Sequence, residues 1–275
     1  MSDLTGPVTI PRLAEPGRLT QARVVVSEWT KLHSLRSTRW SLLAAVVLTI
    51  GLPMLIAAVV ASHWDQMSLR ERSNHSPLDM ALAGVGVAQL AIAVLGVLVI
   101  TGEYSTGMIR ASFTAVPKRL PVLWAKAAVF AVVTFVLMLP SVLIGFFASQ
   151  AILARHHILQ ISFGDPGIGR AVVGGAVYLV LVGVLALSIG AILRNTAGSI
   201  SAFAALFFVI PPLLNILPSS WNDAISPYLP SNAGQAFLVT SNPGGLSPWP
   251  GLALFIGYTA LGLAIAAVLL VRRDT

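Results

Sequence analysis

Very few residues of this chain have the types and spacing that covalent chemistry requires. Many nucleotide hydrolases hold phosphate with a GxxxxGK[ST] loop, and many zinc proteases bind their metal with HExxH on a helix; the sequence contains neither pattern. His156 and His157 are adjacent, so on a helix their side chains would point about 100° apart and could not chelate one metal. Cysteine is absent, which excludes thiolate metal sites. We therefore expect a protein that is not an enzyme and that binds no cofactor or metal itself.

The charged and turn-forming residues with the most regular spacing lie in one segment, Ile100 to Ala127, with the sequence ITGEYSTGMIRASFTAVPKRLPVLWAKA. Glu103 ends an apolar run, Gly107 follows four residues later, and Pro117 closes an amphipathic stretch because proline cannot easily continue a helix. This pattern predicts a short helix parallel to a membrane surface, with an apolar face of Met108, Ile109, Phe113 and Val116. Its polar face would meet a soluble partner or lipid headgroups. The alternative is that each charged residue only caps a helix, pairs locally or binds phospholipid.

The elements that must position this segment are long and apolar. Of the 275 residues, 56% are hydrophobic and 10% are charged, whereas soluble domains have roughly a quarter charged residues. Several apolar runs reach the roughly 20 residues that a membrane-spanning helix needs. The sequence predicts an all-α polytopic membrane protein, with a single transmembrane domain over residues 40–275 and spans at about 40–61, 78–101, 121–154, 168–193, 198–217 and 250–271. The third span is long enough to project beyond the membrane, and we expect a kink at Pro140.

The distribution of positive charge predicts the orientation of these spans. Thirteen of the 17 Lys and Arg residues lie in the N-terminal region, in or beside the connections after the second and fourth spans, or after the sixth. Cytoplasmic loops retain positive charge, so both termini are predicted to be cytoplasmic. Because the basic residues flank apolar runs, they do not indicate nucleic-acid binding. Residues 218–249 contain no Lys or Arg and are expected to face outward with short interfacial helices.

Before the first span, residues 20–39 have the pattern of an amphipathic helix lying in the membrane interface, and residues 1–19 resemble a flexible cytoplasmic tail. Trp29 and Trp40 favour the interface, since tryptophan concentrates there, and Lys31, Arg36 and Arg39 suit its charged surface. A solvated basic leader is the alternative interpretation.

The predicted spans contain no charged residue near their centres. Ion-coupled carriers usually place an ionisable group at that depth, so this class of transporter is disfavoured. Gln89, Gln150 and Asn215 are the main polar side chains at depth, and each could line a pathway or hydrogen-bond a neighbouring helix. A pathway without fixed charge suits amphipathic or lipid-like cargo. Glycines in the fourth span indicate close helix packing or a subunit interface.

With these features, the sequence resembles the permease subunits of type-2 ATP-binding-cassette (ABC) transporters, especially actinobacterial members. The resemblance covers most of the chain: an interfacial helix, six spans with both ends inside, a long fifth-to-sixth connection, and Glu103, Gly107, Pro117, Arg119 and Lys126 in the loop. Residues 104–106 and 109–111 depart from the Gly-Thr pair and leucine-rich run of many relatives.

The resemblance implies that Gly107 through Arg119 form a coupling helix that docks on a separate ABC-type ATPase subunit, which uses ATP and Mg. It also implies a bacterial plasma membrane location, a second permease copy or homologous permease, contact with membrane lipids, and export. The expected coupling loop comprises Glu103, Gly107, Met108, Ile109, Arg110, Phe113, Pro117, Arg119 and Lys126.

Within this loop we expect Glu103 to steady the segment, and Arg119 and Lys126 to hold the membrane edge. The alternative from another functional class is a membrane scaffold or assembly protein that uses the same basic surface to hold a soluble partner.

Overall fold

A computed structural model describes residues 26–30, 36–105, 119–158 and 160–272 of the protein. All regular elements in these ranges are helices, and six of them are long and apolar enough to cross a membrane. The predicted all-α polytopic membrane fold is therefore confirmed. Five of these spans are continuous helices: α2 (Arg36–His63), α4 (Pro77–Ser105), α6 (Arg119–Arg155), α7 (Ile168–Leu193) and α12 (Pro248–Arg272). The sixth is made of three consecutive pieces, which are α8 (Thr196–Ala204), the π-helix η2 (Ala205–Val209) and α9 (Ile210–Leu214).

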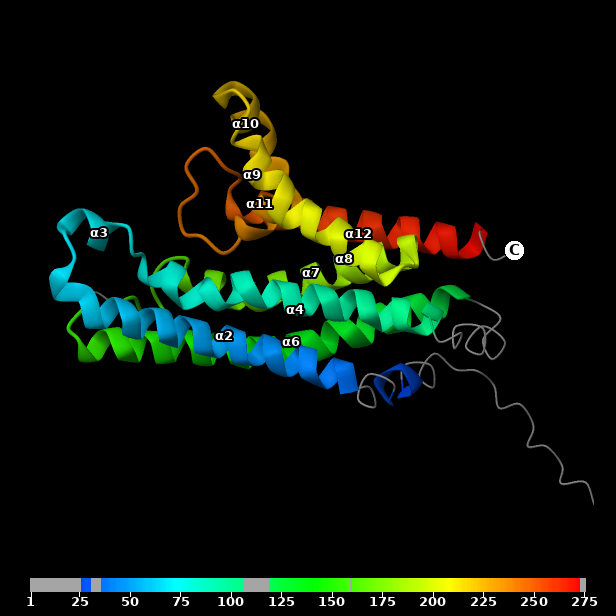
Figure 1. The fold of residues 1–275 in the computed structure, drawn as a ribbon, viewed down its shortest axis with the longest axis horizontal. Coiled ribbons are helices and arrows are strands. Elements are labelled where there is room, and N and C mark those ends of the chain that lie inside the picture. The colour runs from blue at the N-terminus through cyan, green and yellow to red at the C-terminus, as the bar shows by residue number, and fades with distance from the viewer. Residues whose placement is uncertain (1–25, 31–35, 106–118, 159, 273–275) are drawn as a thin grey trace, which may run out of the picture.

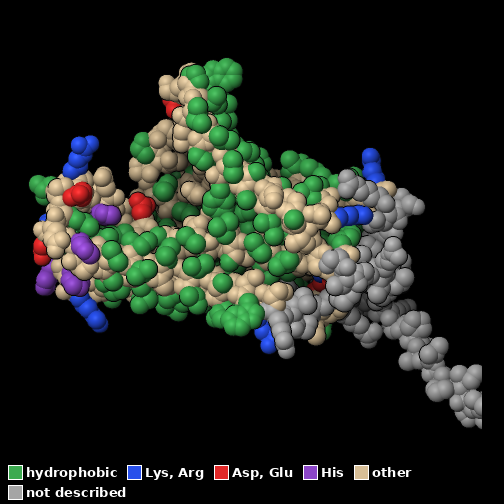
Figure 2. All heavy atoms as spheres, in the orientation of Figure 1, with side chains coloured by type: hydrophobic (Ala, Val, Ile, Leu, Met, Phe, Trp, Pro, Cys, Tyr) green, Lys and Arg blue, Asp and Glu red, His purple; other side chains and the backbone are tan. Residues whose placement is uncertain are grey.

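The long helices form a bundle in which α4 packs against α2 and α7, while α6 contacts α2 and α7 and α12 lies against α7 (Figure 1). Residues 26–30 and the end of α12 lie at the same end of this bundle, which we call the proximal end. At the other, distal end are η1 (Trp64–Gln66) and α3 (Leu69–Ser73). Figure 2 shows hydrophobic side chains along the sides of the bundle and most charged side chains toward its ends. This distribution is typical of a multi-pass membrane protein.

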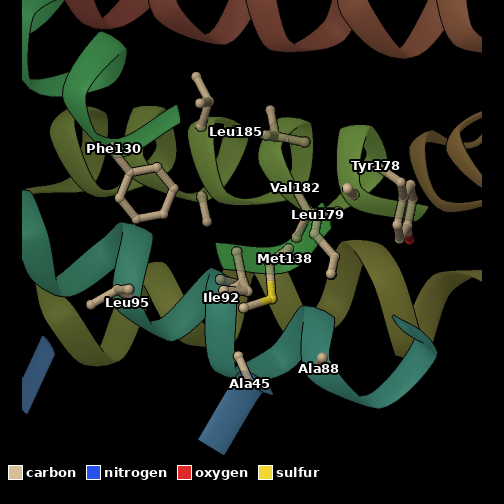
Figure 3. Packing of buried hydrophobic residues seen from close by; sticks show 14 of the residues in the cluster. Ala45, Ala88, Ile92, Leu95, Phe130, Met138, Tyr178, Leu179, Val182 and Leu185 are labelled. Carbon is tan, nitrogen blue, oxygen red and sulfur yellow. The ribbon is translucent and has the colours of Figure 1, made fainter. Parts of the chain in front are cut away.

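The core is built by aliphatic and aromatic side chains that interdigitate between α4, α6 and α7, including Ile92, Phe130 and Leu179 (Figure 3). Small residues allow the helices to approach closely. A Cβ atom added at Gly96 of α4 would overlap the backbone carbonyl of Gly183 in α7, and one added at Gly183 would overlap the Phe130 ring. Close packing therefore involves glycines in the fourth span, as the sequence indicated, and at least one glycine in its neighbour.

The first span begins earlier than the sequence predicts, and the third has nearly the predicted bounds. Residues 36–39 were assigned to the interfacial helix, but they form the first turn of α2. The helix α6 has 37 residues and a length of about 55 Å, so it is longer than the roughly 30 Å hydrocarbon core. Pro140 lies inside this continuous helix. This length fits the predicted projection of the third span beyond the membrane, which stays a prediction, as does the kink at Pro140.

The fifth span is interrupted because of two consecutive prolines. Pro211 and Pro212 lack the backbone N–H that would bond to the carbonyls of residues 207 and 208, and the preceding turn is a π-helix. After α9 the chain forms α10 (Ser219–Ile225), η3 (Ser226–Tyr228) and α11 (Pro230–Gln235). The connection before α12 therefore contains short helices, as predicted.

Arg170, in the first turn of α7, attaches this connection to the bundle. Its Nη1 donates a hydrogen bond to the Phe237 carbonyl, and its Nη2 donates to the Val239 carbonyl at 2.9 Å. The guanidinium also lies 5.4 Å from the centre of the Phe237 ring. The guanidinium cation stabilises these carbonyls, which follow the C-terminal end of α11 and carry partial negative charge.

Candidate functional site

A cluster of three buried charged side chains lies at the proximal end. The Lys126 Nζ donates hydrogen bonds to Glu28 Oε2 at 2.5 Å and to Glu103 Oε1 at 2.9 Å. All three residues are buried, with exposed fractions of 3% for Glu28, 7% for Glu103 and 4% for Lys126. We call this cluster the charged triad. It connects three separate parts of the chain: residues 26–30, the end of α4 and the beginning of α6.

The local structure explains why these groups need one another. Glu103 lies in the last turn of α4, where the partial negative charge of the helix C-terminus disfavours a carboxylate. Lys126 lies about two turns inside α6, and burial of an isolated ammonium there would be costly. Pairing with Lys126 stabilises the carboxylate of Glu103, and pairing with two carboxylates offsets the cost of burying the Lys126 ammonium. Buried ion pairs are retained only when their geometry is good. Removing Lys126 would leave two buried carboxylates without their common cation.

The end of α4 is also attached to the turn between α7 and α8. Thr196 Oγ1 donates a hydrogen bond to Thr101 Oγ1 at 2.9 Å, and the Arg194 guanidinium lies 5.0 Å from the centre of the Tyr104 ring. Arg194 adopts a left-handed conformation with a φ of 54°, which ends α7 before the next helix starts. The last turn of α4 is therefore held on one side by the charged triad and on the other by this turn.

The triad lies at the two ends of the connecting segment that the sequence singled out. Glu103 precedes residues 106–118 and Lys126 follows them, and their side chains form an ion pair with each other. The other predicted coupling residues Gly107, Met108, Ile109, Arg110, Phe113 and Pro117 lie outside the described residues, as do Lys31 of the interfacial helix and the tail 1–19. Arg119 begins α6, and Arg36 begins α2.

The position of Lys126 corrects one expectation. Lys126 was expected to hold the membrane edge, which requires an ammonium exposed to lipid headgroups. Its side chain is instead only 5% exposed and is engaged by two carboxylates. Trp29 and Trp40, which were expected at the interface, are exposed at the proximal end at 47% and 70%.

Glu28 is a functional candidate that the sequence-based interpretation missed. A signal for it exists, because Glu28 is the only acidic residue between Arg18 and Arg39, a stretch that contains five basic residues. An isolated carboxylate among cations on an amphipathic helix suggests a specific basic partner. The identity of that partner, 98 residues further along the chain, could not be read from periodicity.

The structure does not bring the three predicted pathway residues together. Gln89 is buried and accepts a hydrogen bond of 2.5 Å from the Tyr178 hydroxyl, which joins α4 to α7. Gln150, near the distal end of α6, accepts a hydrogen bond from the Ile161 amide at 3.1 Å. Asn215 follows α9 and accepts from the Asn222 side chain at 3.4 Å. Each amide therefore contacts a neighbouring element at a different place in the fold.

These contacts can position helices and transmit displacement between them.

Within the ranges that the structure describes, no three His, Cys, Asp or Glu side chains are close enough to hold a metal ion. Comparison with known proteins adds no identification: no protein-family model matches the chain, and no curated protein is similar to it at a significant level.

Proposed function

We propose that this chain is the membrane-spanning permease subunit of an ABC-type transporter whose ATPase subunits are separate chains. The observation that carries the proposal is the charged triad, because it fixes both ends of the segment expected to receive the motor. Glu103 and Lys126 lie on either side of residues 106–118 and are joined by a 2.9 Å ion pair. A displacement of that segment would act directly on α4 and α6.

The topology supports this proposal and an orientation with both termini in the cytoplasm, and the bacterial plasma membrane is the location that the family resemblance implies. Six spans return the chain to the side on which it started, and residues 26–30 and the end of α12 are found together at the proximal end. Most Lys and Arg residues flank this end in the sequence, which favours the cytoplasm for both termini. The amphipathic segment 106–118 would then face the compartment that contains ATP.

The triad suggests how movement would spread through the membrane domain. When the ATPases close and reopen, they would push on residues 106–118 and shift α4 relative to α6. Glu28 extends the connection to residues 26–30, so the interfacial helix would move with the same unit. The contacts of Thr101 with Thr196 and of Tyr104 with Arg194 would pass the shift to α7 and α8. Buried ionic contacts suit this role because they resist gradual deformation.

Export of an amphipathic or lipid-like compound is the transport reaction that we propose. The apolar spans lack a central charged residue that a hydrophilic ion or a coupling proton would need. The chain itself performs no covalent step. Its partners would be ATPase subunits that bind ATP and Mg, and a second permease copy or homologous permease.

Crosslinking through introduced cysteines tests the docking step. The chain contains no cysteine of its own, so every crosslink must come from the introduced residue. Single cysteines at Arg110 and Ser112 should capture, in membranes, an ATPase with a GxxxxGK[ST] loop encoded beside this chain. A cysteine at Arg70, an exposed residue of α3 at the distal end, is the matched control and should capture none. Capture at Arg70 alone, or at no position, would contradict the proposal.

Reconstitution separates a permease from a scaffold. Proteoliposomes that contain both subunits should move a fluorescent lipid across the bilayer only when ATP and Mg are present. Specific crosslinking without any ATP-dependent movement of lipid or other amphiphiles would favour the scaffold. Movement that stops on collapse of a proton gradient, while ATP remains high, would favour an ion-coupled carrier.

A further inference from the structure

A polar cavity of about 330 Å³ lies in the connection between the fifth and sixth spans. Its wall is formed by α10, η3, α11 and the loop that follows them, and Arg170 holds that loop through the Phe237 and Val239 carbonyls. Asp223, Gln235 and Asn242 in this wall are exposed, so the cavity is open. Cavities of this size fall at the small end of the range for small-molecule sites.

Most polar groups of the wall are neutral, and Asp223 adds one carboxylate. Four of the residues in it are amides, Asn222, Asn232, Gln235 and Asn242, and Ser226 adds a hydroxyl. The surrounding sequence from residue 218 to 249 contains no Lys or Arg, and its only charged residue is Asp223. Amide side chains donate and accept hydrogen bonds, as sugar hydroxyls do. A wall without cations is poorly suited to phosphate or carboxylate ligands.

Some polar groups of this wall already form hydrogen bonds within the protein, and others do not. Asn232 donates to the Ser226 carbonyl and hydroxyl, both at 2.8 Å, and so holds α11 against η3. The Asn222 Oδ1 is buried and has no hydrogen-bond partner within the described part of the chain. A buried acceptor without a donor is unfavourable, and a rotation of the Asn222 side chain toward the cavity would let a ligand hydroxyl supply that donor. Gly244, with a φ of +77°, leaves open space beside the loop backbone.

An apolar surface adjoins the cavity. The arm formed by α9 and α10 projects from the bundle (Figure 1), and Leu213, Ile216 and Trp221 on it are 53%, 80% and 63% exposed. Figure 2 shows hydrophobic side chains along this arm. A hydroxyl-binding cavity beside exposed apolar side chains matches a molecule with a neutral polar head and hydrocarbon chains.

We propose that this cavity binds the sugar head group of a neutral membrane glycolipid while the acyl chains lie against the arm. Asn222 and Asp223 accept hydrogen bonds from sugar hydroxyls, and Gln235 and Asn242 bond to the same head from elsewhere in the wall. Binding requires this chain alone. The inference is therefore independent of an ATPase and would survive failure of the transport proposal.

Native mass spectrometry of the full chain, released from a detergent without a sugar head, measures this binding directly. The probes are diglucosyl diacylglycerol, diacylglycerol and phosphatidylcholine with the same acyl chains, together with free maltose. The glycolipid should bind most tightly, and Asn222→Leu should weaken its binding about fivefold to tenfold, as expected for the loss of a hydrogen-bonding group. Asn74→Leu is the matched control, because Asn74 is an exposed amide outside the cavity, and it should leave binding unchanged.

Each result has a defined meaning. Asp223→Asn preserves the shape of the wall and should weaken glycolipid binding about threefold to tenfold, which keeps the test decisive if Asn222→Leu unfolds. Equal retention of glycolipid and diacylglycerol would overturn the proposal, as would equal effects of Asn222→Leu and Asn74→Leu. Preference for phosphatidylcholine that disappears in Asp223→Asn would reassign the cavity to cationic heads. Competition by maltose at the affinity of the glycolipid would support the sugar site and overturn the role of the acyl chains.

Discussion

Replacing Lys126 with methionine is the most direct test of the charged triad. Methionine resembles lysine in length and keeps apolar contacts, but it removes the ammonium that holds Glu28 and Glu103. Two carboxylates that are 3% and 7% exposed would then lose their common partner. The proximal end of α6 would separate from both the end of α4 and residues 26–30.

The expected loss follows from the burial and the distances. Breaking a buried ion pair by removing one partner costs about 3–5 kcal/mol, and both bonds of Lys126 are short, at 2.5 and 2.9 Å. We therefore expect Lys126→Met to lower the free energy of unfolding by about 3–5 kcal/mol. Neutralising all three residues, with Glu28→Gln and Glu103→Gln added, should restore most of that loss, since no charge is left buried.

Chemical unfolding of the purified chain in lipid discs, followed by circular dichroism, measures these changes. Arg155→Met is the matched control, because Arg155 ends the same helix and is exposed, and it should change the free energy of unfolding by at most about 0.5 kcal/mol. Equal losses in Lys126→Met and Arg155→Met would refute the reasoning. So would a triple neutral variant no more stable than Lys126→Met.

Three further predictions concern other parts of the fold. Gly96→Ala should lower the free energy of unfolding by about 1–3 kcal/mol, because its methyl group overlaps the backbone of α7. Gly86→Ala is the control and should not lower it, because nothing lies within 4 Å of the added atom. Thermal unfolding of the two variants measures the difference. Hydrogen bonds from the Ser68 hydroxyl and amide lower the pKa of Glu71 from its ordinary value. The ionised carboxylate therefore stabilises α3 fully at a pH above the ordinary pKa of glutamate, and this stabilisation should be lost as the pH falls through the lowered pKa of Glu71. Carboxyl carbon NMR should show this titration, and Ser68→Ala should return the pKa toward its ordinary value; an unchanged pKa in that variant would contradict the assignment. Arg170→Met should accelerate amide hydrogen exchange in residues 236–245, and unchanged exchange would show that its two bonds to carbonyls do not hold this loop.

Much of the fold was predictable because a bilayer imposes one simple requirement on each span. Backbone groups in hydrocarbon must be satisfied internally, so about 20 apolar residues predict a helix regardless of what surrounds it. The helices α7 and α12 begin and end close to the predicted boundaries for this reason. The start of α2 and the end of α4 were less predictable, since each helix continues four residues beyond the apolar run, into polar and charged residues.

The candidate site was only half predictable. Glu103 and Lys126 were singled out by their spacing around one segment, but spacing along the chain does not reveal which side chains meet. Lys126 was expected at the lipid surface because lysines at the ends of spans usually lie there. Its burial depends on Glu28, which reaches it from a different part of the chain.

The sequence by itself determined that this protein is a bundle of six apolar helices, because span length and hydrophobicity are local properties that the membrane selects. Tertiary structure alone decided which polar groups are paired. Glu28 with Lys126, Gln89 with Tyr178, and Arg170 with the carbonyls after α11 each join residues more than 60 positions apart. Such pairings depend on which helices lie side by side, as α4 and α7 do at Gly96 and Gly183, and spacing along the chain does not specify this.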